Sequence, residues 1–298
     1  MNGFINLLKP PGMTSSDAVL AVRRLLPKKT AVGHGGTLDP DAAGVLPICV
    51  GKATRLFDYI IDKQKVYVGE LCLGVTTDTY DLSGRIISAK TVNMDFSRIE
   101  EAARTFTGQI MQLPPMYSAL KQGGEPLYKK ARKGQTAELQ PRPVRVDSIE
   151  ILEQTAENRF LMRIACGKGV YIRSLMHDIG QKLGCGGCMS FLMRERAGAM
   201  DVSGALTLDE IVSEPDKSAC LLPLDFLLDA YPKAVVAEQY RQNVINGQTI
   251  RPAWANLPCE EAGEEAGKTL RLYVGDEFAG MGERTPDGIR INAMLLDR

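Results

Sequence analysis

The spacing of hydrophobic and polar residues predicts several amphipathic helices. The clearest runs from Ser97 to Gly108, with Ser97 and Glu100 fitting a capping box at its start and Gly108 as its stop. Its apolar side chains repeat at i, i+3, i+4 and i+7: Ile99, Ala102, Ala103 and Phe106. A second helix follows Gly169 and ends at Gly184, with one apolar face. That face consists of Ile172, Leu175, Met176, Ile179 and Leu183.

Two further helices are predicted near the start of the chain. Ser15 or Ser16 is expected to cap a helix that runs to about Leu26, where Pro27 closes it. Residues 52–62, KATRLFDYIID, form the other. Between them lies a glycine-rich stretch, residues 32–51, which predicts a loop.

Strands are indicated by β-branched and aromatic runs. In the first part of the chain these are GFINLL (3–8), KVYVGELCLGV (65–75), PVRVDSIEILEQ (143–154) and RFLMRIACG (159–167), the last two joined by the polar turn TAEN. Short strand-like runs recur near the C-terminus: TLRLYVG, FAGMGER and GIRINAML. Because strands and helices do not alternate regularly, we expect an α+β fold with a mixed, largely antiparallel sheet flanked by helices.

The helical and strand patterns lapse near residues 213–232, which predicts a domain boundary close to residue 230. The chain of 298 residues is long enough for one large domain and a small one. We therefore expect a catalytic domain over 1–230 and a small β domain over 231–298.

Composition and charge exclude several protein classes. Lys plus Arg and Asp plus Glu each number 36, so overall charge does not identify a partner. The N-terminal stretch lacks the pattern of a signal peptide, and no apolar run reaches the roughly 18 to 20 residues that a membrane span needs. Seven scattered cysteines do not resemble a disulfide framework. These features favour a cytoplasmic protein without a membrane partner.

The glycine-rich stretch does not meet the requirements of a nucleotide cradle. A P-loop needs G-x-x-x-x-G-K-[ST], whereas Gly44 and Gly51 are too far apart and Ala53 stands where the hydroxyl should be. A dinucleotide fingerprint needs a third glycine at a fixed distance, which Gly33-His34-Gly35-Gly36 lacks at the right place, and Asp39 would repel a pyrophosphate.

A metal site is also not indicated. The chain has two histidines, and the pair Cys185 and Cys188 has the spacing of half a zinc site without a second C-x-x-C. An acidic residue in a glycine-built turn remains. From the residues alone, Asp39 either stabilises a tight turn or is presented to a ligand.

Five sequence blocks carry a resemblance to a known family. They are KPPGMTS, GHGGTLDPDAAGVLPICVGKATR, KVYVGELCLGVTTDTYDLSG, PPMYSALKQGGEPLYKKARKG and CGKGVYIRSLMHDIGQKLGCG, and in this order they span most of residues 5 to 200. This arrangement resembles the TruB family, the bacterial tRNA pseudouridine-55 synthases. The resemblance implies the pseudouridine-synthase fold, a PUA-like C-terminal β domain, a monomer and an isomerase that modifies the T-loop uridine of tRNA without cofactor or metal.

The resemblance also implies roles for four residues. Asp39 of GTLDP matches the catalytic aspartate, which acts either as a nucleophile towards the sugar or as a base at C2′. Arg173 matches the arginine that pairs with that aspartate. Tyr67 matches the active-site tyrosine that stacks on the target base, and His34 matches a histidine that helps to hold the flipped nucleotide or its neighbours.

A basic stretch is expected to contact the tRNA T-arm, within an RNA-gripping insertion over about residues 115–145. A uridine in a folded loop must be extruded to reach a buried carboxylate, and phosphate contacts help to offset that cost. The predicted RNA-binding residues are Lys9, Lys121, Lys129, Lys130, Arg132, Lys133 and Arg142, with Arg145 beside them.

Some positions depart from the family pattern. Gly35, Gly167 and Val170 replace the usual Thr, Ser and Thr, and Gly187-Cys188 replaces a frequent Ala-His, but none of the first three changes removes an ionisable group. Residues 232–298 carry eight basic and ten acidic residues, so any RNA contact there is confined to one face. The competing hypothesis is an RNA-binding or tRNA-folding protein that retains the scaffold without catalysis.

Overall fold

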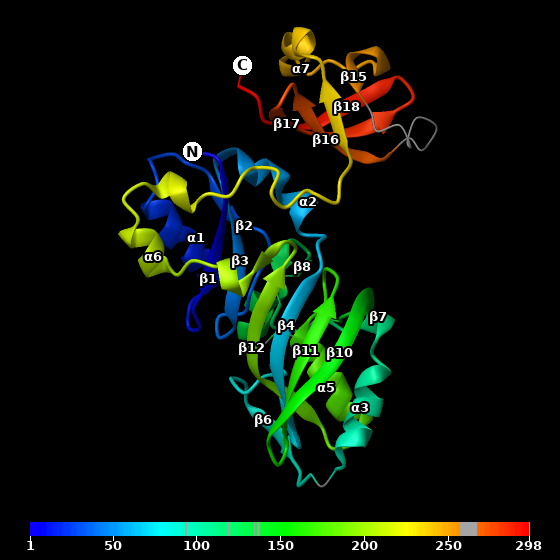
Figure 1. Ribbon diagram of the computed structural model, residues 1–298. Coiled ribbons are helices and arrows are strands. Elements are labelled where there is room, and N and C mark those ends of the chain that lie inside the picture. Colours follow the sequence, from blue (N-terminus) through cyan, green and yellow to red (C-terminus); the bar gives the residue numbers. More distant parts are fainter. Residues whose placement is uncertain (93, 119, 134, 136–137, 257–266, 298) are drawn as a thin grey trace.

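The computed structural model describes residues 1–298 except 93, 119, 134, 136–137, 257–266 and 298. A nine-stranded sheet with flanking helices forms the larger part, and a five-stranded sheet forms a separate layer at the C-terminal end (Figure 1). This arrangement confirms the predicted α+β class with a small C-terminal β domain.

The large sheet follows the order β1-β3-β12-β4-β11-β10-β7, with β2 beside β3 and β13 beside β12. Its neighbours pair antiparallel, apart from the parallel pair of β12 and β3, so the sheet is mixed and largely antiparallel as predicted. The strands are β1 (Gly3–Lys9), β2 (Val32–His34), β3 (Ala43–Val50), β4 (Lys65–Leu73), β7 (Gly108–Gln112), β10 (Arg142–Ala156), β11 (Arg159–Cys166), β12 (Gly187–Ala197) and β13 (Met200–Asp201).

Three helices cover this sheet and supply its core: α1 (Ser15–Arg24), α3 (Phe96–Arg104) and α5 (Ile172–Lys182). Most of the periodic positions predicted from the sequence are buried, for example Ile99 in α3 and Leu175 in α5, whereas Phe106 and Leu183 follow the ends of these helices and are half-buried. They pack into one hydrophobic cluster with sheet residues such as Leu71 and Phe160. Burial of these apolar faces is the main favourable term that holds helix to sheet.

The predicted caps of two helices are wrong. Helix α1 is capped by Thr14, whose side chain accepts from the Asp17 backbone N–H, because the chain is still extended at Thr14. Helix α3 begins at Phe96 after Asp95, without a side-chain cap, so Ser97 already lies inside the first turn. A sequence pattern locates a helix better than it locates the residue where the helix begins.

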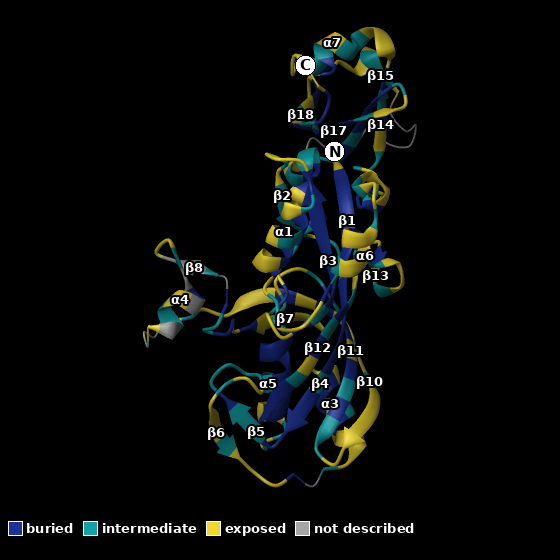
Figure 2. Cartoon of the chain, turned by 90° about the vertical axis from the view of Figure 1, so that its left-hand side faces the viewer, coloured by how far each residue is buried: buried dark blue, intermediate teal, exposed yellow. Residues whose placement is uncertain are grey.

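Shorter elements complete the larger part. The single helix predicted over residues 52–62 is instead the 3₁₀ helix η1 (Gly51–Leu56) followed by one turn, α2 (Phe57–Ile60). The others are β5 (Val75–Thr77), β6 (Ile86–Ala89), β8 (Lys121–Gln122), β9 (Glu125–Pro126), α4 (Leu127–Arg132), η2 (Val202–Gly204), α6 (Leu208–Ser213) and η3 (Lys217–Cys220). Elements β8 and α4 project away from the body (Figure 2). No helix in the described part of the chain is both long and apolar enough to traverse a bilayer.

The C-terminal sheet has the order β15-β14-β16-β17-β18, and three of its strands are those predicted from the sequence. Its elements are β14 (Lys233–Val236), η4 (Glu238–Tyr240), α7 (Arg241–Ile245), η5 (Pro252–Trp254), β15 (Ala255–Asn256), β16 (Thr269–Val274), β17 (Glu277–Thr285) and β18 (Gly288–Met294). Met281 and Leu295 pack with Phe4 and Val45 of the larger sheet, so an apolar contact joins the two parts.

The packing of α5 generates a prediction about pH. Burial raises the pKa of Asp178 from 3.8 to about 6. Since the folded state binds this proton more tightly than the unfolded chain, the stabilisation is present at low pH and is lost as pH rises through 6. Asp178→Asn is expected to unfold at higher urea concentration than the wild type at pH 7 and at the same concentration at pH 4. An equal midpoint at pH 7 would contradict a buried carboxylate.

Candidate active site

The loop between β2 and β3, residues 35–42, presents Asp39 at the surface of the large sheet. The Ser15 hydroxyl donates to the Leu38 carbonyl at 3.0 Å and accepts from the Leu38 N–H at 2.9 Å. Ser15 therefore fixes the loop immediately before Asp39, whereas the sequence suggested that it caps a helix.

Lys9 fixes the other side of Asp39. Its side chain is fully buried, and the ammonium donates to the carbonyl oxygens of Met13 at 2.6 Å, Pro10 at 2.7 Å and Pro40 at 3.0 Å. Burial lowers the pKa of Lys9 to about 8, although the nearby charges of Asp41 and Asp39 oppose this. The prediction that Lys9 contacts RNA is wrong, because its donors are consumed inside the protein.

Arg173 holds the Asp39 carboxylate with two parallel hydrogen bonds. Its Nε lies 2.8 Å from Oδ2 and its Nη2 lies 2.9 Å from Oδ1. The side chain of Arg173 is 6% exposed and that of Asp39 is 35% exposed, so the cation is buried and the carboxylate is partly open to solvent. Two parallel hydrogen bonds of this kind fix the direction of a carboxylate.

Two more segments satisfy the remaining donors of Arg173. Nη1 donates to the Thr79 carbonyl at 3.1 Å, and Nη2 donates to the Tyr117 carbonyl at 2.9 Å. Asp81 adds a second carboxylate, 3.6 Å from Nη1. Asp81 was not identified as a site residue from the sequence. The one feature that could have indicated it is an acidic residue inside the turn-forming sequence TYDLSG.

Tyr67 lies on β4 with its side chain buried. Burial raises the pKa of its phenol, and the neighbouring Arg194 only partly offsets this, so the phenol stays protonated at neutral pH. A neutral phenol in this place can stack on a ring and can donate a proton.

His34 is the last residue of β2, directly before the loop that carries Asp39. Burial lowers its pKa, as does the charge of Arg194, so the ring is neutral at neutral pH. It borders a cavity of about 580 Å³ with Leu20, Arg23 and Phe57 among the other lining residues. No contact between His34 and Asp39 is found in the described part of the chain.

The predicted basic stretch lies mainly on the projecting α4 and on β10. Lys129 and Arg142 are exposed, and Lys130 is half-buried. Lys133 is 2.7 Å from Glu125, so its charge is partly neutralised within the protein. The side chains of Lys121 and Arg132 fall outside the described part of the structure, as do the acidic residues of 259–266.

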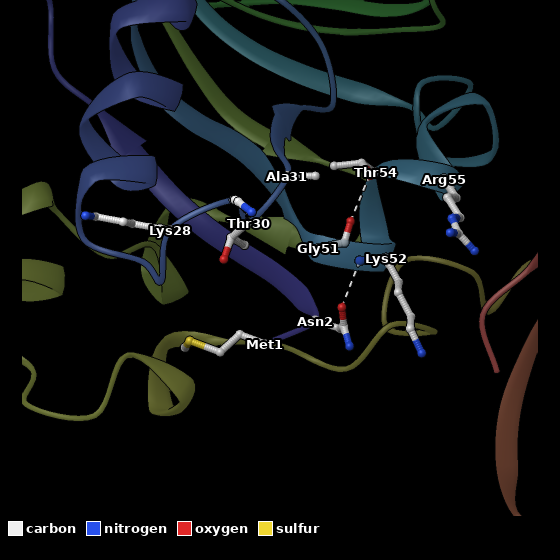
Figure 3. A pocket seen from close by; sticks show the side chains of 10 residues that line it. Met1, Asn2, Lys28, Thr30, Ala31, Gly51, Lys52, Thr54 and Arg55 are labelled. Atoms are coloured by element: carbon white, nitrogen blue, oxygen red, sulfur yellow. Dashed lines mark hydrogen bonds between the residues drawn. The ribbon is translucent and has the colours of Figure 1, made fainter. Parts of the chain in front are cut away.

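A second basic area was not singled out in the sequence. A cavity of about 390 Å³ is lined by Lys28, Lys29, Lys52 and Arg55, and none of its described lining residues is acidic. Figure 3 shows Lys28 on one side of it and Lys52 and Arg55 on the other. It lies beside Gly51, at the opposite end of β3 from the Asp39 loop.

The basic side chains that line this cavity are not equally free to bind a ligand. Lys52 is 2.7 Å from Asp297, and Arg55 donates to the Met294 carbonyl at 2.7 Å, so both also tie the larger part to the C-terminal domain. Lys28 and Lys29 are exposed, and Lys29 has a left-handed backbone with φ of 70°. A lysine in this conformation is uncommon and is frequently found where a side chain has a function.

The cysteine pair of the CGGC sequence does not form a half-site for metal. Cys188 faces Cys72 across the strands β12 and β4, while Cys185 contacts the Gly186 carbonyl. Across the described residues, no group of three or more His, Cys, Asp or Glu side chains is arranged to hold a metal ion.

Family models match most of the chain. The model of the "TruB family pseudouridylate synthase (N terminal domain)" matches residues 23–172, and that of the "tRNA pseudouridylate synthase B C-terminal domain" matches residues 173–229. The second match ends before the C-terminal β sheet begins.

Individual proteins are similar over nearly the full length. The tRNA pseudouridine synthase B of Alkaliphilus oremlandii is 43% identical over 282 residues, covering 95% of this chain and 93% of the relative. That of Heliobacterium modesticaldum is 46% identical over 230 residues, covering 76% and 75%. A solved H/ACA RNP bound to a substrate RNA containing 2′-deoxyuridine has a chain with a TM-score of 0.76 at 26% identity, covering 99% of this chain and 86% of that one.

The contacts of Lys9 generate a stability prediction. Lys9→Ala removes the donor shared by three carbonyl oxygens, and we expect a loss of about 2 to 3 kcal/mol in the free energy of unfolding. Urea denaturation at pH 7 measures it, with exposed Lys28→Ala as the control. A Lys9→Ala protein as stable as the control would show that these hydrogen bonds do not hold the loop.

Proposed function

Because this chain belongs to the TruB family of pseudouridylate synthases, we propose that it isomerises a uridine of tRNA to pseudouridine, and that this uridine is position 55 in the T-loop. One observation carries the chemical part of this proposal. The Asp39 side chain is 35% exposed and is held by Arg173, whose side chain is only 6% exposed. A protein that only bound RNA would not need an exposed carboxylate, because its negative charge repels the phosphates of the RNA.

The reaction exchanges one bond to the sugar for another. The N1–C1′ bond of the uridine breaks, the uracil turns while bound, C5 joins C1′, and the proton on C5 is lost as N1 gains one. Asp39 starts this either by attacking C1′ as a nucleophile or by taking the proton at C2′. Both routes require the carboxylate to face the sugar in one direction, which the two hydrogen bonds from Arg173 fix.

The pocket supplies the other requirements from this chain's own residues. Arg173 keeps Asp39 in one orientation, since its remaining donors are held by the Thr79 and Tyr117 carbonyls. The neutral phenol of Tyr67 is assigned to stacking on the extruded uracil. His34, neutral and bordering its own cavity, is assigned to contacts with the flipped nucleotide or its neighbours.

RNA contact is assigned to two basic areas that flank the pocket. The projecting α4 offers Lys129 and Lys130, and Arg142 follows on β10. The cavity of Lys28 and Lys29 lies near the C-terminal domain, at the other end of β3. Phosphates recognised at both places would hold the substrate across the catalytic loop without reading its sequence.

The wider setting follows from the same family. We assign the chain to the cytoplasm as a monomer, with the T-arm of tRNA as its partner and no cofactor. The C-terminal sheet is assigned to a PUA-like domain over residues 231–298 that supports the tRNA at a distance from the reacting base.

The role of Asp39 predicts a separation of binding from turnover. Asp39→Asn keeps the size of the side chain and removes the charge that either chemical route requires. We expect pseudouridine in tRNA to fall below detection by mass spectrometry after chemical derivatisation, while tRNA affinity stays within about threefold. Asp41→Asn, two residues along the same loop, is the matched control. Turnover by Asp39→Asn at the wild-type rate would contradict the proposed function.

The two basic areas predict a salt effect. Reversal of Lys129 and Lys130 to Glu, and separately of Lys28 and Lys29, is expected to weaken tRNA binding and to lower the slope of log affinity against log salt by about one for each phosphate that is no longer neutralised. Lys182→Glu, at the end of α5, is the control and should leave the slope unchanged. A pair whose reversal leaves the slope unchanged does not contact the RNA.

A further inference from the structure

Among the residues that the structure describes, Arg194 is the largest side chain that is almost completely buried. It lies on β12, between β3 and β4 in the large sheet, and is 1% exposed. Its Cα partner on β4 is Tyr67, and its partner on β3 is Gly44. Directly opposed residues on neighbouring strands place their side chains on the same face, so Arg194 and Tyr67 point the same way.

The guanidinium bonds both arms of the loop that carries Asp39. Its Nη2 donates to the Gly36 carbonyl at 3.1 Å, before Asp39, and its Nε donates to the Val45 carbonyl at 2.7 Å, after Asp39. Nη1 lies 3.5 Å from the Thr37 carbonyl. One planar group therefore spans the two ends of the loop, which a flexible ammonium with a single nitrogen cannot do.

The backbone of the same residue is part of the arrangement. Gly44 has φ of 112°, and a Cβ there would lie 2.2 Å from the Arg194 carbonyl oxygen. Only glycine lets the loop return to the sheet this close to β12. The side chain and backbone of Arg194 thus both define the path of the loop.

Arg194 also acts on the other groups of the pocket through its charge. In the described part of the chain its hydrogen bonds to the loop end on carbonyl oxygens, and no carboxylate lies within ion-pair distance. Burial lowers the pKa of Lys9, His34 and Lys65, and the charge of Arg194 lowers each further. A buried cation without a carboxylate partner is costly, which points to a role beyond packing.

We propose that Arg194 is a positioning residue for the isomerisation: its guanidinium holds the Asp39 loop and the Tyr67 phenol in one fixed arrangement. This inference rests on the proposed function. It gives the enzyme a second arginine that never touches the substrate and acts through the residues that do.

The test compares two variants. Arg194→Lys keeps the positive charge but loses the planar guanidinium with its several donors, and Arg194→Met loses both the charge and the donors. We expect kcat for pseudouridine formation to fall on the order of 100-fold in both, since small displacements of reacting groups have effects of this size. The tRNA dissociation constant should stay within about threefold. Arg196→Met, an exposed arginine two residues along β12, is the matched control and should behave as the wild type.

Two readouts separate positioning from a general loss of structure. Hydrogen exchange of residues 35–42 should be faster in both Arg194 variants, with the exchange of α5 unchanged. In an NMR titration, the pKa of His34 should rise in Arg194→Met and stay near the wild-type value in Arg194→Lys, while that of His177, the other histidine, stays constant in both.

Three results would overturn the inference. These are wild-type kcat in Arg194→Lys, unchanged exchange of residues 35–42 in both variants, or a parallel loss of activity, tRNA affinity and α5 protection that marks a purely structural residue. Failure of the proposed function is separate and visible in the wild type, which would then bind tRNA without forming pseudouridine. The exchange and titration measurements would still decide whether Arg194 holds the loop.

Discussion

The hydrogen-bonded pair of Arg173 and Asp39 is the interaction on which the arrangement of the pocket depends. A nearly enclosed guanidinium must have its donors satisfied, and three segments converge on Arg173 of α5 to do so: the loop of Asp39, the turn of Thr79 and Asp81, and the segment of Tyr117. Because the cation lies inside and the carboxylate faces outwards, the charge that the chemistry requires is available to a substrate and fixed in direction.

Buried cationic side chains hold the loop around Asp39 through hydrogen bonds to backbone carbonyl oxygens. Lys9 donates to the Pro40 carbonyl, and Arg194 donates to the carbonyls of Gly36 and Val45. These buried donors satisfy carbonyl oxygens that face the protein interior. The glycine-rich segment can therefore hold one backbone conformation without a hydrophobic core of its own. This explains how a short loop can present a carboxylate in one orientation.

Periodicity predicted the elements of the fold far better than it predicted the contacts of single polar residues. The apolar faces of α3 and α5 follow directly from spacing, because burial selects every third or fourth residue. Lys9 and Arg194 could not be recognised this way, since a strand that alternates polar and apolar residues looks the same whether its polar side chain meets solvent or a buried carbonyl. The resemblance pointed to Asp39 and Arg173, but the partners that orient them, Thr79 and Tyr117, contribute backbone oxygens that no side-chain pattern records.

The most direct test of the central claim is the release of tritium from tRNA whose uridines are labelled at C5. Joining C5 to C1′ expels the hydrogen at C5, so isomerisation of one T-loop uridine predicts release that levels off at one tritium per tRNA and maps to position 55. The wild-type protein should give this release with neither cofactor nor added metal. Tight binding of tRNA without any release would contradict the account and leave a protein that binds RNA on a synthase scaffold.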